Sequence, residues 1–283
     1  MRIGGFGWSL LLLFAGTGPA GAVVTSSVVA GSLLVSSDAA DAIAVTCTAG
    51  NAEVNGANPG TGVATCATLT QITVNGGPGA NDINLSTVSA SNFTTLASVQ
   101  ISGGDGADTL TGSRVADTLS GGPGDDTIIG STGNDVALLG TGDDVFVWNP
   151  GDGSDVVDGQ GDADVLRFNG SNVNEIINIS ATGARARLFR NVANITMDLG
   201  TVERIEVNAL GGADTLAVDP LAGTDVTTVR FDLAATGGVG DAQADTVNFN
   251  GSAAADALNA SGSPAQLAVT DGTANVLVLG AES

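Results

Sequence analysis

Aspartates and apolar residues recur in a fixed pattern between Gly103 and Asp164. Most of these aspartates follow a glycine-rich stretch, and an apolar residue stands two positions after each. The first three pairs, nine residues apart, are Asp108 with Leu110, Asp117 with Leu119, and Asp126 with Ile128. Apolar positions bounded by turn residues predict short strands joined by tight turns. Because one nonapeptide cannot bury a core alone, the period predicts a stacked solenoid.

The glycines of this stretch complete a longer motif. Gly103 to Leu110 and Gly121 to Ile128 both read Gly-Gly-x-Gly-x-Asp-x-apolar. The motif resembles the RTX (hemolysin-type) calcium-binding repeat. That resemblance implies an all-β fold, namely a parallel β-solenoid (calcium-binding β-roll) with two nonapeptides per turn, here flanked by irregular β-solenoid and strand segments. Later aspartates keep the step, apart from a two-residue slip before Asp155.

The resemblance also implies that Ca²⁺ is the cofactor of the roll. Calcium takes six to eight oxygen ligands from carboxylates and carbonyls, and glycines at positive φ let a loop turn its carbonyls inward. The implied metal-site residues are Gly103, Gly104, Gly106, Asp108, Gly121, Gly122, Gly124, Asp126, Gly133, Asp135, Gly140, Gly142, Asp144, Gly153 and Asp155.

Two edges of the implied roll carry these loops. Its first edge stacks the loops that end at Asp108, Asp126 and Asp144, and its second edge stacks those that end at Asp117, Asp135 and Asp155. At the start of the second edge, Ser113 and Val115 replace glycines and Arg114 adds positive charge. We therefore expect about two ions on the first edge and about one on the second. Asp117→Ala should cost little calcium affinity.

An alternative interpretation is a glycine-rich solenoid that needs no metal, since aspartate and glycine are also common turn residues. Charge argues against it. Gly103 to Asp164 contains thirteen Asp, no Glu and a single basic residue, Arg114. Stacked carboxylates without counter-ions repel one another, which favours calcium.

Four segments divide the chain. Residues 1–22 read as a signal peptide, with Arg2 before an apolar stretch and a small-residue cleavage site at Ala20-Gly21-Ala22. An uncleaved anchor is the alternative, but the apolar stretch is shorter than a bilayer span. We expect a secreted or cell-surface protein without a membrane span after cleavage. The remaining segments are an N-terminal β segment (23–98), the β-roll (99–166) and a β-rich C-terminal segment with degenerate repeats (167–283).

The N-terminal segment contains the two cysteines of the chain, Cys47 and Cys66. In an exported protein such a pair favours a disulfide over a metal or redox site, which would need histidine or Cys-x-x-Cys spacing. Gly76 to Leu85 looks like a displaced repeat with one residue inserted before Asp82. We expect its coils to share the axis of the roll. Gly211 to Asp219 and Gly251 to Leu258 are further repeat-like copies, with weak metal binding or none expected.

Two features near the end of the roll allow more than one interpretation. Phe146 and Trp148 fall on one face of a strand, as a carbohydrate platform or, in our preferred interpretation, as a lateral cap over the core. Beyond Val165, segments 174–180 and 184–190 read as a hairpin-like pair of strands. Arginines gather there, and they could grip an acidic glycan or simply offset nearby carboxylates such as Glu175, Glu203 and Glu206; we prefer the second reading.

Composition narrows the function classes. Net charge is −22, from 8 basic and 30 acidic residues, so contacts with nucleic acid or an anionic membrane surface are disfavoured. The sequence has no His and no Tyr, and no acid-base or nucleophile constellation is recognisable, so we do not expect an enzyme. The favoured function is a secreted calcium-binding protein that folds or rigidifies outside the cell. Alternatives are an adhesion or matrix module binding a glycan, surface polymer or protein, and a fragment of a larger enzyme.

Overall fold

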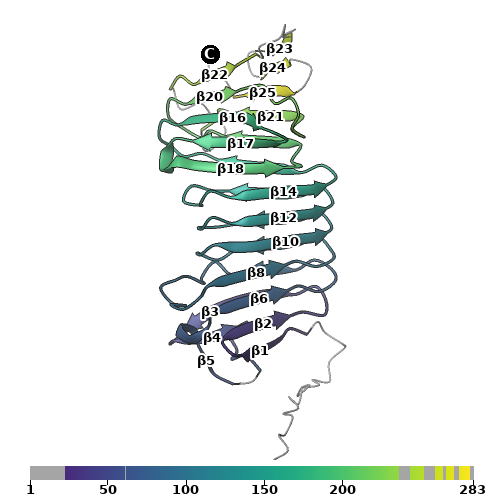
Figure 1. Cartoon of the computed structure of the whole chain (residues 1–283). Coiled ribbons are helices and arrows are strands. Elements are labelled where there is room, and N and C mark those ends of the chain that lie inside the picture. Colours follow the sequence, from purple (N-terminus) through teal and green to yellow (C-terminus); the bar gives the residue numbers. More distant parts are fainter. Residues whose placement is uncertain are drawn as a thin grey trace, which may run out of the picture.

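The protein is a solenoid of short strands stacked along one axis (Figure 1). The computed structural model describes residues 23–60, 62–235, 243–251, 259–263, 266–270 and 274–280. The signal peptide expected at 1–22 and most of the repeat-like copy at 251–258 lie outside these ranges.

Two sheets form the walls of the solenoid. In the described residues the first contains, in spatial order, β1 (Thr25–Val29), β2 (Ser32–Ser36), β6 (Gln71–Asn75), β8 (Ser98–Ser102), β10 (Asp117–Pro123), β12 (Val136–Thr141), β14 (Val156–Gly161), β18 (Ile195–Gly200), β17 (Arg185–Arg190), β16 (Ile176–Thr182), β20 (Thr215–Val218) and β22 (Thr246–Phe249). The second contains β23 (Asn259–Ser263), β24 (Gln266–Thr270), β25 (Asn275–Leu279), β21 (Thr228–Asp232), β19 (Arg204–Asn208), β15 (Val165–Asn169), β13 (Val145–Trp148), β11 (Thr127–Ile129), β9 (Thr109–Thr111), β7 (Asp82–Asn84), β3 (Ala42–Thr48), β4 (Asn51–Val54) and β5 (Ala64–Thr65). Two short 3₁₀ turns, η1 (Cys66–Thr68) and η2 (Val192–Asn194), complete the described elements.

Successive repeats alternate between the two sheets, so every second repeat pairs in parallel. Leu119 of β10 lies beside Ala137 of β12, and Ile128 of β11 lies beside Phe146 of β13. All four side chains are fully buried. The apolar residue two positions after each aspartate thus fills the space between the sheets, and the expected parallel β-solenoid is confirmed.

An antiparallel insertion interrupts the first sheet above the roll. Strand β16 pairs antiparallel with β17, which pairs antiparallel with β18, and β18 then continues the parallel stack on β14. The hairpin expected from segments 174–180 and 184–190 is therefore confirmed.

The N-terminal coils continue both sheets of the roll, because β6 pairs in parallel with β8 and β7 with β9. The insertion predicted before Asp82, in the repeat from Gly76 to Leu85, is wrong. Asp82 pairs with Thr109, the residue after Asp108, so Asn81 and not Asp82 stands in the aspartate position. No residue is inserted; the repeat is regular and carries asparagine in place of aspartate.

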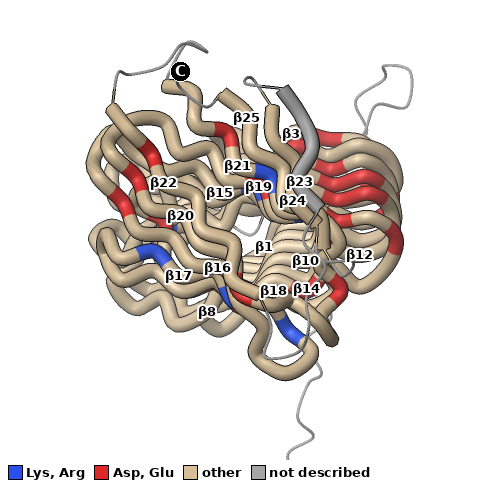
Figure 2. The backbone as a smooth tube through the Cα atoms, turned by 90° about the horizontal axis from the view of Figure 1, so that it is seen from above, with Lys and Arg blue, Asp and Glu red and all other residues tan. Residues whose placement is uncertain are grey.

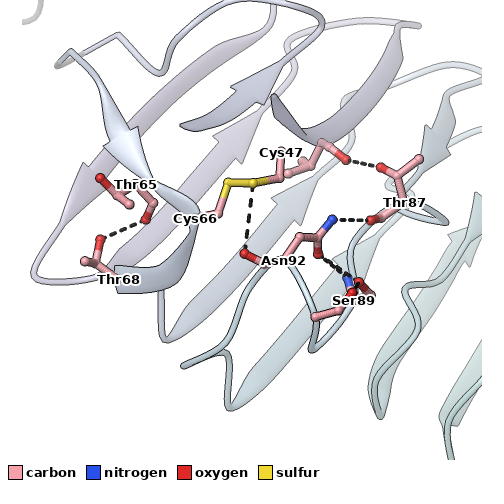
Figure 3. Close-up of a disulfide and its surroundings, with 9 residues drawn as sticks. Cys47, Thr65, Cys66, Thr68, Thr87, Ser89 and Asn92 are labelled. Carbon is pink, nitrogen blue, oxygen red and sulfur yellow. Dashed lines mark hydrogen bonds between the residues drawn. A yellow bond between two sulfur atoms is a disulfide. The ribbon is translucent and has the colours of Figure 1, made fainter. Parts of the chain in front are cut away.

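Cys47 and Cys66 form a disulfide, as expected (Figure 3). The bond joins β3 to η1, and the Cys66 side chain is buried in the core. Beside it, Asn92 accepts hydrogen bonds from Ser89 and donates one to the Thr87 carbonyl, at 2.9 Å. The disulfide therefore joins the β3–β4 hairpin to η1, the turn that leads into β6.

The aromatic pair lies inside the solenoid instead of capping it laterally. Phe146 and Trp148 are fully buried, and the Trp148 ring stacks on Phe168 of the next coil with centroids 4.1 Å apart. The Trp148 indole N–H donates to the Gly153 carbonyl at 2.8 Å, which anchors the loop containing the two-residue slip. Buried rings offer no carbohydrate platform.

Candidate metal centre

Backbone-to-carboxylate hydrogen bonds connect the loops of the first edge into a ladder. The Asp108 N–H donates to Asp126 Oδ1 and the Asp126 N–H to Asp144 Oδ1, both at 2.7 Å. The ladder continues in both directions, since the Asn81 N–H donates to Asp108 Oδ1 and the Asp144 N–H to Asp164 Oδ1. Seen along the axis, acidic residues stack over one another on the connecting loops (Figure 2).

The second edge carries a shorter ladder of the same kind. The Asp117 N–H donates to Asp135 Oδ1 at 2.8 Å, and the Asp135 N–H donates to Asp155 Oδ1 at 2.9 Å. The expected division of the aspartates between two edges is confirmed, and the two-residue slip before Asp155 leaves the stacking intact.

The second carboxylate oxygen of most ladder residues is buried without a hydrogen bond. Within the described residues this holds for the Oδ2 atoms of Asp108, Asp126, Asp135, Asp144, Asp155 and Asp164. These aspartates are at most 2% exposed. Burying a carboxylate oxygen without a hydrogen-bond partner costs free energy. A cation bound beside these six atoms would offset that cost.

The surrounding atoms are further oxygen atoms. A Cβ atom built on Gly103 would overlap both Asp108 Oδ2 and the carbonyl oxygen of Gly121 in the next coil, and one built on Gly121 would overlap Asp126 Oδ2 and the Leu139 carbonyl oxygen. A carboxylate oxygen and a main-chain carbonyl of the adjacent coil thus converge beside the first glycine of each loop. That donor set suits Ca²⁺. No group of three His, Cys, Asp or Glu side chains able to hold a metal was found in the described part of the chain.

The second and fourth glycines of the motif are required by both conformation and space. Gly122 and Gly124 have φ of 119° and 132°. A Cβ on either would also overlap the carbonyl oxygen of Gly104 or Gly106 in the coil below. The remaining predicted site glycines occupy corresponding loop positions: Gly104, Gly106, Gly133, Gly140 and Gly142 have positive φ, and Gly153 packs against the Gly133 carbonyl. Calcium coordination by the individual predicted residues stays a prediction.

Asp117 differs from the other ladder aspartates. The Ser113 hydroxyl donates to Asp117 Oδ1 at 2.6 Å, and the Ser113 N–H donates to Asp117 Oδ2 at 2.5 Å. Ser113 has no positive φ, in contrast to Ser131 at the same position of the next loop on this edge. Both oxygens of Asp117 therefore have protein donors, and the loop has less need of a cation.

Burial raises the pKa values of the ladder aspartates. Desolvation raises the pKa of Asp126 to about 7 and that of Asp135 to about 8, with added repulsion from neighbouring aspartates. The same cause raises the pKa of Asp155 and Asp164 to about 7. Without a counter-ion, the charged forms of these carboxylates are disfavoured.

Asp164 is a ladder residue that is not among the predicted metal-site residues. Its Oδ2 lies close to Gly159 together with the Thr201 carbonyl oxygen, and its N–H donates to Glu203 Oε2 at 2.8 Å. Gln160 and Asp162 replace the motif glycines here, yet both adopt positive φ, at 76° and 73°. The signal in the sequence was the return of Asp164 to the nine-residue step.

The arginines beyond the roll are engaged within the protein. Arg185 bridges Asp158 and Asp198, and Arg167 and Arg204 both pair with Glu206. In the described residues beyond the roll, Arg190 also pairs with Glu175 and Arg230 with Asp232, while Arg187 lies over the Phe189 ring. These contacts favour the interpretation that the arginines offset the negative charge of nearby carboxylates. Glu203 is an exception to our expectation, because its carboxylate accepts the N–H of Asp164 in the ladder.

Comparison with known families bears directly on the ladder. Residues 99–119 and 111–146 match the sequence model of the RTX calcium-binding nonapeptide repeat, in four copies. This part of the chain is an RTX repeat array. RTX repeats bind Ca²⁺, and the oxygen-lined loops described above fit that ion. The match ends before Asp155 and Asp164, although both ladders continue through those residues.

Other comparisons add little to the RTX assignment. The comparison with curated proteins gave no match. Among solved structures, the extracellular lipase LipA from Serratia marcescens is similar over 65% of this chain, at 13% identity and a TM-score of 0.18. The chain spans 38% of that protein's length. Such a low TM-score carries no argument about fold or activity. In the described residues, no helix has the length and apolarity needed to cross a bilayer.

Proposed function

We propose that the chain is an exported calcium-binding β-solenoid whose roll between Gly103 and Asp164 becomes rigid when it takes up calcium outside the cell. The observation that carries this proposal is the set of six buried Oδ2 atoms that lack hydrogen-bond partners within the described residues. Calcium neutralises such atoms only when the loops are stacked, so binding and folding are coupled.

Export is supported by two features of the N-terminal part. The first 22 residues have the sequence features of a secretory signal, and the Cys47–Cys66 disulfide suits an oxidising compartment. Calcium outside cells is abundant enough for sites of modest affinity, in the range of about 10⁻⁴ to 10⁻³ M. The loops can therefore remain metal-poor before export and fill afterwards.

The ladders indicate how many ions the roll takes up. Three gaps on the first edge lie between successive aspartates with an unpartnered Oδ2: Asp108 to Asp126, Asp126 to Asp144, and Asp144 to Asp164. The second edge has one such gap, between Asp135 and Asp155. At one ion per gap we propose about four calcium ions. The first edge thus holds one more ion than the motif alone indicates.

We also propose that the chain is not an enzyme. The sequence lacks His and Tyr. The buried acids of the roll are engaged in ladders, and Glu175 and Glu206 in ion pairs. Turnover of a hydrolase substrate that is lost when a particular acid is replaced would contradict this part of the proposal.

A calcium titration of the chain from Val23 onward tests the function. Isothermal calorimetry should give a stoichiometry near the number of gaps, and circular dichroism should show β signal that rises cooperatively with calcium and reverses with EDTA. Mg²⁺ serves as the control, because it demands a smaller octahedral site. A chain that is fully ordered in EDTA and releases no heat with calcium contradicts the proposal.

A further inference from the structure

Asn81 occupies the ladder position below Asp108 on the first edge. Its N–H donates to Asp108 Oδ1 at 2.7 Å, and its own Oδ1 accepts the N–H of Asp41 at 3.0 Å. The side chain is 3% exposed. Asn81 Oδ1 therefore performs the coil-spacing role that Oδ1 performs in every aspartate of the ladder.

Asn81 Nδ2 is a hydrogen-bond donor at the position where a ladder aspartate has the acceptor Oδ2. Asn81 Nδ2 lies 2.9 Å from the Gly77 carbonyl oxygen and 2.7 Å from that of Gly79, within its own loop. It also lies 3.3 Å from the Gly103 carbonyl oxygen and 3.2 Å from Asp108 Oδ1, in the coil above. An amide nitrogen is a donor with two hydrogens, and all four neighbours are acceptors. Their arrangement also fixes the amide orientation, because a flipped Oδ1 would face oxygen on every side.

One coil higher, the equivalent atom is an acceptor. Asp108 Oδ2 lies beside Gly103 with the Gly121 carbonyl oxygen, just as Asn81 Nδ2 lies beside Gly76 with the Gly103 carbonyl oxygen. At Asp108 both atoms are oxygens, and a cation beside them relieves the repulsion between the charged carboxylate and the carbonyl. At Asn81 a donor meets the same oxygens, and no cation is needed.

We propose that the Asn81 side-chain amide takes the place of a calcium ion and sets the lower limit of metal binding on the first edge. The proposal rests on calcium uptake by the roll, as described under the proposed function. Ser113 has the matching role on the second edge, where its hydroxyl and N–H saturate Asp117. Each ladder thus begins with a loop closed by protein donors, and the coils below position the first calcium loops without metal.

The test is Asn81→Asp, compared with wild type by native mass spectrometry and calorimetric calcium titration. The variant restores an acceptor that faces the carbonyl oxygens of Gly77, Gly79 and Gly103. It should bind one calcium ion more than wild type. In EDTA its melting temperature should fall below that of wild type, and saturating calcium should remove most of the difference.

Asn84→Asp is the matched control. Asn84 is exposed in the same segment, and its Oδ1 accepts hydrogen bonds from the Ser86 N–H and hydroxyl, which an aspartate can also accept. It adds the same charge without a cage of carbonyl oxygens, so the calcium count should not change. If wild type binds calcium and Asn81→Asp gains no ion, this inference alone is overturned. If wild type binds none, the proposed function falls as well.

Discussion

Asp126 Oδ1 accepts the backbone N–H of Asp108, eighteen residues earlier, at 2.7 Å, while Asp126 Oδ2 is buried without a hydrogen-bond partner in the described residues. The two oxygens of one carboxylate therefore have separate tasks. One fixes the spacing between coils through the backbone, and the other is available to a metal. Asparagine can perform the first task but not the second, and this difference leads to the first prediction.

Asp126→Asn should make the middle of the first edge independent of calcium. The amide keeps Oδ1 for the Asp108 N–H and turns a donor toward the carbonyl oxygens near Gly121. The variant should bind fewer calcium ions than wild type. In EDTA its free energy of unfolding should rise by about 1 kcal/mol, because a buried acceptor without a partner becomes a hydrogen-bonded donor. Calorimetric titration and chemical denaturation in EDTA measure the two effects.

Asp105→Asn is the control for that charge change. Asp105 belongs to the same edge but is exposed, so its replacement should leave the number of bound ions unchanged. If Asp105→Asn loses an ion and Asp126→Asn loses none, calcium binds at the outer face of the loops and not at the buried Oδ2 atoms.

Asp117→Ala should affect stability without reducing the number of calcium ions. Its carboxylate accepts the hydroxyl and the N–H of Ser113, and both donors lose their partner. We expect a loss of about 1–3 kcal/mol in EDTA, with the calcium stoichiometry of wild type. Native mass spectrometry of Asp117→Ala beside Asp126→Ala makes the comparison. An equal loss of ions from both variants would refute the distinction between the two loops.

The periodic part of the fold could be predicted from the sequence because each repeat places its aspartate and its apolar residue at the same positions. The nine-residue step placed Leu119 beside Ala137 and Ile128 beside Phe146, and the parity of the repeats assigned Asp108 and Asp117 to different edges. The disulfide followed from there being two cysteines in a chain with the features of export.

Residues outside the consensus could not be assigned so readily. A regular repeat at Gly76 to Ile83 is not evident from the motif, because Asn81 stands where the motif has aspartate. Glu203 enters the ladder after a long antiparallel insertion, which shifts its distance from Asp164 to thirty-nine residues. The position of the Phe146 and Trp148 rings inside the core depends on Phe168 from the next coil, and a local strand pattern contains no information about that contact.

Acidity should stabilise the metal-free roll and weaken calcium binding. A raised folded-state pKa means that the folded carboxyl holds its proton more tightly than the unfolded one. Metal-free stability should therefore be greatest at low pH and be lost as pH rises from the ordinary value of 3.8 through about 7 for Asp126 and about 8 for Asp135. Calcium displaces these protons, so its affinity should rise over the same window.

Melting temperatures measured in EDTA and in calcium between about pH 5 and pH 8 test both trends. The EDTA curve should fall with pH and the calcium curve should rise relative to it. Parallel curves would show that the ladder carboxylates keep the same proton in both states and that calcium binds elsewhere.

The disulfide should stabilise the N-terminal coils without changing the roll. Replacing both Cys47 and Cys66 by serine should cost about 3 kcal/mol in the chain-entropy model. Hydrogen exchange should rise in β3 to β6, and the calcium stoichiometry should stay that of wild type. A lower stoichiometry in the double variant would instead mean that the covalent bond helps to position the calcium loops.

Arg190 should be the most sensitive cation of the upper coils. Its guanidinium donates to Glu175 Oε1 and to the Ser171 hydroxyl, and both side chains of the ion pair are almost completely buried. A Cβ on Gly170 would meet Glu175 Oε2 and the Ala209 carbonyl oxygen, an arrangement like that at the calcium loops. An arginine thus neutralises a loop carboxylate here, which is the role that we propose for calcium in the roll.

Arg190→Ala leaves Glu175 buried without its cation, and we expect a loss of about 3–5 kcal/mol in the free energy of unfolding. Arg187→Ala is the matched control, because Arg187 lies half-buried over Phe189 on the same strand, and it should cost about 1 kcal/mol or less. Denaturation in saturating calcium isolates these effects from the roll. If Arg190→Ala, relative to wild type, loses much less stability in saturating calcium than in EDTA, the Glu175 loop can itself accept the ion. If both variants cost the same, the buried pair contributes nothing beyond an exposed contact.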